Sequence, residues 1–175
     1  PDGRARKVTE VADGLNIPIG VYPFRSPSSV AADVRRRTPE SGVDSASSPR
    51  RLPDETWKAL VWSIPYIWLL EDTDGDGKAD KREPLYGPFD HTRDTHGNQA
   101  SFRRGFDGWL YATHGFNNDS HVTARDGSHV DLNSGNTYRI RLDGSRIEHH
   151  THGQVNPFGL AWDARGNLYS SDCHS

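Results

Sequence analysis

The feature that most constrains the fold is a repeated strand start led by glycine. The segments GWLY at 108–111 and GNLY at 166–169 each follow a turn and begin 58 residues apart, at positions 108 and 166. A second pair, LNIPIGV at 15–21 and VNPFGL at 155–160, places an Asn and a Pro ahead of a glycine that opens a strand. Short strands and turns repeated at such a period are typical of propeller blades.

Composition agrees with a polar all-β chain. The 17 Gly and 11 Pro among 175 residues favour turns and disfavour long helices, and the five Trp can supply much of the buried area. The net charge of −3 gives no global field that would recruit nucleic acid, so no nucleic-acid partner is expected. No apolar run approaches the roughly 20 residues needed to span a bilayer, which predicts no transmembrane segment here.

We therefore expect an all-β fold, a partial β-propeller with antiparallel four-stranded blades. A blade needs about four strands, so residues 1–175 form one domain of about two and a half blades, and we expect the chain to be a fragment. Residues 25–53 differ in character, with seven Ser, four Pro and six Arg but almost no large apolar residue. Such a stretch cannot bury enough surface to offset its ordering entropy, which predicts a disordered insertion.

The stretch DTDGDGKADKRE at 72–83 matches the calcium-loop pattern. Hard oxygen ligands spaced two apart let one tight loop wrap a single Ca²⁺. The expected ligands are Asp72, Asp74, Asp76, the Lys78 carbonyl, Asp80 and Glu83. Prolines at 65 and 84 do not suit a helix–loop–helix unit, so the loop should join two strands, and Glu83 then need not reach the ion. The alternative is an Asp/Gly-rich hairpin without metal.

Polar residues near the innermost strands are the candidate functional site. The segments 96–98 and 154–156 precede equivalent strands. Equivalent points of successive propeller blades lie around one ring and face the central channel. We therefore expect a set of side chains to converge at one end of the blades: His96, Asn98, His114, Asn117 and Asn156. Histidine can accept a hydroxyl proton near neutral pH. The alternative is that these are turn histidines bonded to backbone carbonyls.

Five segments, which cover most of the chain outside 25–57, carry a resemblance to a known family. They are KVTEVADGLNIPIGVYPF, WSIPYIWLLEDTDGDGKADKRE, DTHGNQASFRRGFDGWLYATHGFNNDS, NSGNTYRIRLDGSRIE and GQVNPFGLAWDARGNLYSSDCHS. The chain resembles the N-terminal part of the six-bladed propellers of the soluble quinoprotein glucose/sorbosone dehydrogenase type. Within that type it is closest to the membrane-bound dehydrogenase branch of planctomycete-type bacteria, in which a c-type haem domain is often fused to the propeller.

The resemblance implies a dehydrogenase that oxidises a sugar or polyol with pyrroloquinoline quinone and calcium, in a periplasmic, secreted or membrane-associated setting. It places the catalytic base at His96 and continues the cofactor site through Asn156 to Asp172. Val155 stands where the family has an arginine that would hold the quinone's oxygens. Asn98, His114 and Asn117 complete the candidate cofactor-binding set.

Two other hypotheses stay open at this point. A calcium-dependent lactonase-like hydrolase would use a central Ca²⁺ to polarise a carbonyl, and four side chains could serve as its ligands: Asn98, Asn117, Asn156 and Asp172. A non-catalytic propeller would bind glycan or protein. A C-x-x-C-H haem motif in further sequence would favour electron transfer over both.

Overall fold

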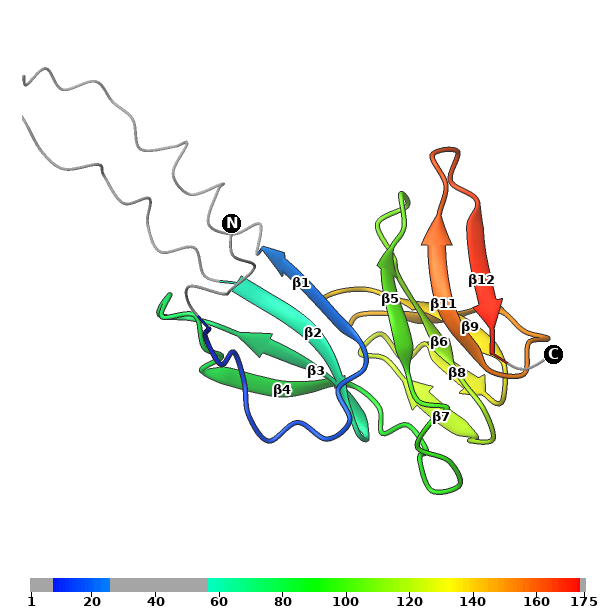
Figure 1. Ribbon diagram of the computed structural model, residues 1–175, viewed down its shortest axis with the longest axis horizontal. Coiled ribbons are helices and arrows are strands. Elements are labelled where there is room, and N and C mark those ends of the chain that lie inside the picture. The colour runs from blue at the N-terminus through cyan, green and yellow to red at the C-terminus, as the bar shows by residue number, and fades with distance from the viewer. Residues whose placement is uncertain (1–7, 26–56, 174–175) are drawn as a thin grey trace, which may run out of the picture.

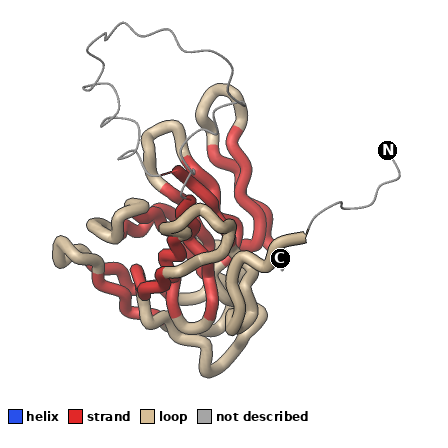
Figure 2. The backbone as a smooth tube through the Cα atoms, turned by 90° about the vertical axis from the view of Figure 1, so that its left-hand side faces the viewer, coloured by secondary structure: helices blue, strands red, loops and turns tan. Residues whose placement is uncertain are grey.

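The computed structural model describes residues 8–25 and 57–173, and this part of the chain is built of strands, turns and loops without a helix (Figure 1; Figure 2). Its first sheet, blade 1, has four antiparallel strands in chain order: β1 (Val21–Arg25), β2 (Trp57–Ser63), β3 (Tyr66–Glu71) and β4 (Lys81–Tyr86). Pro65 interrupts the apolar run of 57–70 and ends pairing there, so the run forms two strands, as predicted.

Blade 2 is a second antiparallel sheet of four strands, in the order β10-β9-β6-β5. Its strands are β5 (Ala100–Arg104), β6 (Leu110–His114), β9 (Asn136–Ile140) and β10 (Ile147–Thr151). Between β6 and β9 the chain inserts a separate hairpin of β7 (Ser120–Thr123) and β8 (His129–Leu132). Blade 3 contributes two paired strands, β11 (Pro157–Trp162) and β12 (Leu168–Asp172).

One hydrogen bond recurs in all three blades and establishes the repeat. The residue that follows the second strand donates its backbone N–H to a carbonyl ahead of the first strand. The pairs are Ile64 to Asn16 at 3.1 Å, Gly115 to Gly97 at 3.0 Å and Cys173 to Asn156 at 3.2 Å. The GWLY and GNLY segments accordingly open equivalent strands, β6 and β12. The prediction of a partial, propeller-like all-β fold with antiparallel four-stranded blades is confirmed.

Blades 1 and 2 share one hydrophobic core. Trp62 of β2 packs edge-on against Phe89, which lies in the connection between the blades, with ring centroids 5.5 Å apart. Phe89 in turn contacts Tyr138 of β9 at 5.9 Å. A smaller cluster of Trp109, Tyr111 and Leu160 joins blade 2 to blade 3. The strand tryptophans therefore serve as core, as their alternation indicates.

The insertion expected at 25–53 lies outside the described residues except for Arg25, which ends β1. In the part of the chain that is described, no helix has the length and apolar character needed to cross a bilayer.

Candidate functional site

The loops that precede β5 and β11 meet the loop that follows β6 at one end of the blades, which we call the loop end. Phe116 donates its N–H to Oδ1 of Asn156 at 3.1 Å, which joins blade 2 to blade 3. A methyl group on Gly97 would overlap the backbone of Phe116, and one on Gly115 would overlap Asn156 Oδ1. Only glycine permits this close approach, so these loops are fixed against one another.

His96 projects from this loop end with 94% of its side chain exposed. Its Nδ1 lies 3.1 Å from Oδ1 of Asp94, and the same oxygen accepts the backbone N–H of His96 at 2.8 Å. An ionised carboxylate can only accept a hydrogen bond, so Nδ1 carries the proton in the neutral ring. The Nε2 lone pair then faces solvent, as a general base requires.

Asp94 was not among the residues singled out from the sequence. The sequence did carry a signal for it: an Asp side chain commonly accepts the backbone N–H of the residue two positions later, in an Asx turn, and His96 is two positions after Asp94. In this loop the Asx turn also holds the carboxylate beside the imidazole ring of His96.

Asn156, ahead of β11, and Asp172, the last residue of β12, are joined by hydrogen bonds at the same end. Asp172 accepts the N–H groups of Val155 and Asn156, both at 2.7 Å, and the Asn156 amide reaches Cys173 Sγ at 3.0 Å. In blade 1 the equivalent contact is made by Ser63, whose Oγ accepts the N–H of Asn16 at 2.7 Å. These side chains shape the strand entries of their blades.

His114 differs from the other candidates because its ring is fully buried. Its Nδ1 lies 2.9 Å from the Asn133 carbonyl, and its Nε2 lies 2.9 Å from Oγ of Ser120. A carbonyl accepts, so Nδ1 donates, and Nε2 accepts from the Ser120 hydroxyl. Both ring nitrogens are thus used within the fold, and the ring faces the β7–β8 hairpin instead of the exposed His96.

Burial lowers the pKa of His114, because desolvation penalises its charged form. Unfolded histidine binds a proton near pH 6.5 while the folded protein resists it, so stability is present above that pH and is lost as pH falls below it.

We expect urea unfolding at pH 7.5, 6.5 and 5.5 to show this loss of stability, at most about 1.4 kcal/mol per pH unit. His114→Gln should flatten the slope and His129→Gln, at an exposed site, should not. Equal slopes in all three proteins would contradict this.

Asn98 and Asn117 occupy different environments. Asn98 is 2% exposed, and its Nδ2 donates to the Thr95 carbonyl at 2.7 Å. Its Oδ1 and both amide atoms of the neighbouring Gln99 are buried without a hydrogen-bond partner in the described structure. Asn117 is exposed with a φ of 67°, and its N–H donates to Ser134 Oγ. The amides of Asn98 and Gln99 are thus buried within the loop end, whereas Asn117 is open to solvent.

The predicted calcium loop joins β3 to β4, as expected. Ligand oxygens of Asp72, Asp74 and Asp80 lie within 4.8 Å of one another, and Asp72 is buried. Asp72 accepts the N–H groups of Gly75 and Gly77, which folds the loop around its carboxylate. Hydrogen bonds from Thr73 to its carboxylate lower the pKa of Asp80. Clustered, ionised oxygen ligands of this kind suit a hard cation.

The remaining predicted calcium ligands lie differently. Asp76 accepts the N–H of Lys78 at 2.7 Å and is not part of the group of three carboxylates. Glu83 is a residue of β4, and its carboxylate pairs with Arg125 at 3.0 Å. The loop lies where β3 ends, opposite to the β2–β3 turn and hence opposite to the loop end of the blades (Figure 1). A cation there would stabilise blade 1 without contact with His96.

Comparison with known proteins yields one match. Residues 46–175 match the family described as a domain of unknown function, DUF7133. The chain belongs to this family. The matched DUF7133 region includes the predicted calcium loop, His96 and Asn156, and it starts after β1. No curated protein and no solved structure matches the chain.

Proposed function

We propose that the loop end binds a polyhydroxylated compound, a sugar or polyol, and that His96 acts as general base in its oxidation. The observation that carries this proposal is the pairing of His96 Nδ1 with Asp94 at 3.1 Å while the ring is 94% exposed. Asp94 orients the ring. Nε2 accepts the proton of a substrate hydroxyl group, while hydride leaves the carbon that bears this hydroxyl for a two-electron acceptor.

The quinone that the family resemblance implies does not fit the described residues at this end. Val155 is an apolar side chain, 40% exposed, at the position where an arginine would hold the quinone's oxygens. Arg93, in the loop that carries His96, is engaged by Asp119 at 2.7 Å. We therefore derive no step through pyrroloquinoline quinone, and the proposal rests on His96 and Asp94.

The hydrolase alternative has less support from the geometry. It needs a central Ca²⁺ held by side chains of the loop end, but Asn156 Oδ1 and both oxygens of Asp172 accept backbone N–H groups. Within the described ranges, the three-carboxylate group is the one in the β3–β4 loop, at the other end of the blade. Proton abstraction by His96 requires no metal at the loop end, so we place it first.

The proposal is tested by dye-linked oxidation. The full chain is supplied with Ca²⁺ and a two-electron acceptor dye, with and without added quinone, and challenged with a panel of aldoses and polyols. We expect dye reduction that depends on substrate. Lactone hydrolysis by the same preparation, with no oxidation of any panel member, would replace this proposal by the hydrolase.

We also propose that Ca²⁺ binds the β3–β4 loop and stabilises blade 1. A ligand that binds only the folded state adds about 2.7 kcal/mol of stability when its concentration is 100 times its dissociation constant. Millimolar Ca²⁺ should therefore raise the melting temperature measurably. Asp74→Ala should remove most of this rise. Asp74 is exposed and supplies one of the three carboxylates, so its loss weakens binding without opening the core.

Asp126→Ala is the matched control for the calcium measurement. Asp126 holds a similar Asx turn through Ser128, but it lies in the β7–β8 turn, outside the carboxylate group. Its variant should respond to Ca²⁺ as the parent does. Calorimetry without a Ca²⁺ signal at millimolar concentration, or with the same signal in Asp74→Ala, would remove the calcium proposal.

A further inference from the structure

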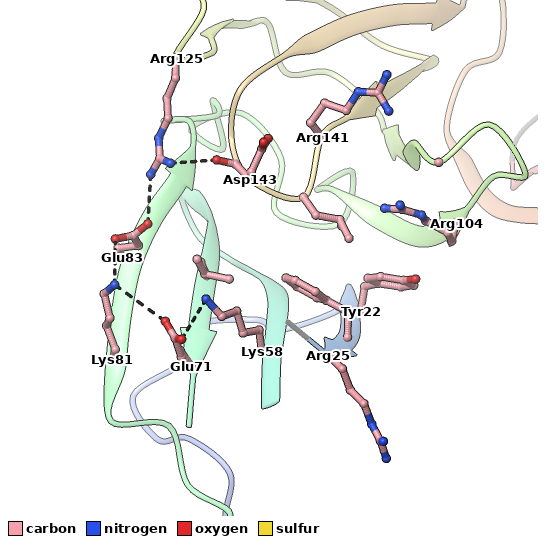
Figure 3. Close-up of a pocket in the computed structure, with 14 residues that line it drawn as sticks. Tyr22, Arg25, Lys58, Glu71, Lys81, Glu83, Arg104, Arg125, Arg141 and Asp143 are labelled. Atoms are coloured by element: carbon pink, nitrogen blue, oxygen red, sulfur yellow. Dashed lines mark hydrogen bonds and ion pairs between the residues drawn. The ribbon is translucent and has the colours of Figure 1, made fainter. Parts of the chain in front are cut away.

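A groove of about 700 Å³ opens between blades 1 and 2 (Figure 3). Its blade 1 residues lie where β1 and β3 end, which is the end of the blade opposite to the loop end that carries His96. The groove is lined by residues of β1 to β5 and of the turns that follow β5, β7 and β9. Six cationic side chains line it: Arg25, Lys58, Lys81, Arg104, Arg125 and Arg141. Three acidic residues, Glu71, Glu83 and Asp143, oppose them, which leaves a formal surplus of three positive charges.

The carboxylates of this groove are already engaged on the blade 1 side. Glu71 pairs with Lys58 at 2.9 Å and with Lys81 at 3.8 Å, and Glu83 pairs with Arg125 at 3.0 Å (Figure 3). The Asp143 carboxylate accepts the N–H of Ser145 and so fixes its own turn. Little negative charge is left for the opposite wall.

Two arginines of blade 2 form that opposite wall. Arg104 ends β5 and Arg141 follows β9, and neither has an ion pair with a carboxylate of the described residues. A methyl group placed on Gly108 would lie 3.6 Å from Nη2 of Arg104 and 3.8 Å from Nη1 of Arg141. Both guanidinium groups therefore converge beside one turn.

The guanidinium group of Arg141 is held in place by the Trp109 ring before any ligand binds. Its guanidinium carbon lies 3.8 Å from the centre of the Trp109 ring, and the residue is half-buried. Stacking on an aromatic face leaves the N–H edge of a guanidinium free to bind an oxyanion. Tyr22 and Phe24, whose rings are stacked with centroids 6.2 Å apart, provide an aromatic surface on the facing wall.

We propose that this groove is a binding site for a small ligand that carries an oxyanion, that is, a phosphate, sulfate or carboxylate group, held by Arg104 and Arg141. Planar guanidinium forks match the oxygens of such groups and form short, charge-assisted hydrogen bonds with them. Tyr22 and Phe24 pack against the apolar part of the ligand. The site is separate from the loop end, so it stands independently of the function proposed for His96.

The test is titration of the full chain with inorganic phosphate, sulfate and acetate at constant ionic strength maintained with sodium chloride, followed by calorimetry. We expect saturable binding of at least one oxyanion beyond any effect of chloride. Tighter binding of phosphate or sulfate assigns a tetrahedral group and tighter binding of acetate assigns a carboxylate, and both results support the site. The absence of saturable binding by all three would overturn it.

Three variants show whether the arginines are responsible. Arg104→Gln should weaken binding by about 10-fold or more, because a charged hydrogen-bond partner is lost. Arg141→Lys keeps the charge but loses the fork, so its binding should fall as well. Arg165→Gln, at an exposed arginine in the β11–β12 turn, is the matched control and should bind as the parent does. Unchanged affinity in Arg104→Gln, with the protein folded, would refute the proposal.

Discussion

His96→Ala is expected to lower sugar or polyol oxidation by about 10²- to 10⁴-fold in kcat/KM, the range for loss of a general base. The fold should hardly change, because the side chain is 94% exposed and substitutions at such positions usually alter stability by less than about 0.5 kcal/mol. Steady-state kinetics with the dye-linked assay measure the first effect and urea unfolding measures the second.

Two neighbours of His96 make this result interpretable. Asp94→Asn keeps the shape of the loop but can present an amide N–H to the ring, which favours the wrong tautomer, so a smaller loss of kcat/KM is expected. His91→Ala removes a histidine of the same loop whose Nδ1 faces the Phe89 carbonyl, and it should leave kinetics unchanged. Activity retained in His96→Ala would show that the base is elsewhere.

The blade architecture could be predicted because its determinants are local. Gly108 and Gly166 adopt φ values of 80° and 86°, which glycine reaches without strain, and each turns the chain into the second strand of its blade. Pro65 separates β2 from β3, and the aspartates of 72–80 form a loop whose side-chain hydrogen bonds lie within nine residues. Sequence spacing carries all of this information.

Features that depend on long-range contacts could not be predicted. The sequence near 119–135 indicates a hairpin. It does not indicate that β6, which precedes this hairpin, pairs with β9, which follows it. His114 is followed by a glycine as His96 is, yet contacts with Asn133 and Ser120 bury it. Arg104 and Arg141 converge only after β5 and β9 take their places in blade 2. Alternation and turn residues do not encode such partners.

Trp62→Ala is expected to lower the free energy of unfolding by about 3–5 kcal/mol, the range for removing a large buried aromatic side chain. Trp62 is completely buried in the core that blade 1 shares with blade 2. A domain is stable by only about 5–15 kcal/mol, so this change removes a large part of the total. Urea unfolding followed by far-UV circular dichroism gives the measurement.

Trp62→Phe separates packing from hydrogen bonding at the same position. The indole Nε1 of Trp62 is buried without a hydrogen-bond partner in the described structure, so phenylalanine loses volume but no hydrogen bond. Its cost should be clearly smaller than that of Trp62→Ala, because phenylalanine leaves a smaller cavity than alanine does. Phe106→Ala, where 77% of the residue is exposed, should have almost no effect.

The same experiment decides whether the two blades unfold as one unit. Trp62 contacts Phe89 at 5.5 Å and Phe89 contacts Tyr138 of blade 2 at 5.9 Å, so a cavity at Trp62 weakens packing in both blades. A single transition, shifted to lower urea in Trp62→Ala, is expected. Two transitions, with only the earlier one shifted, would show that the blades are independent. The walls of the groove between Arg104 and Tyr22 come from different blades, so unfolding of either blade removes that groove.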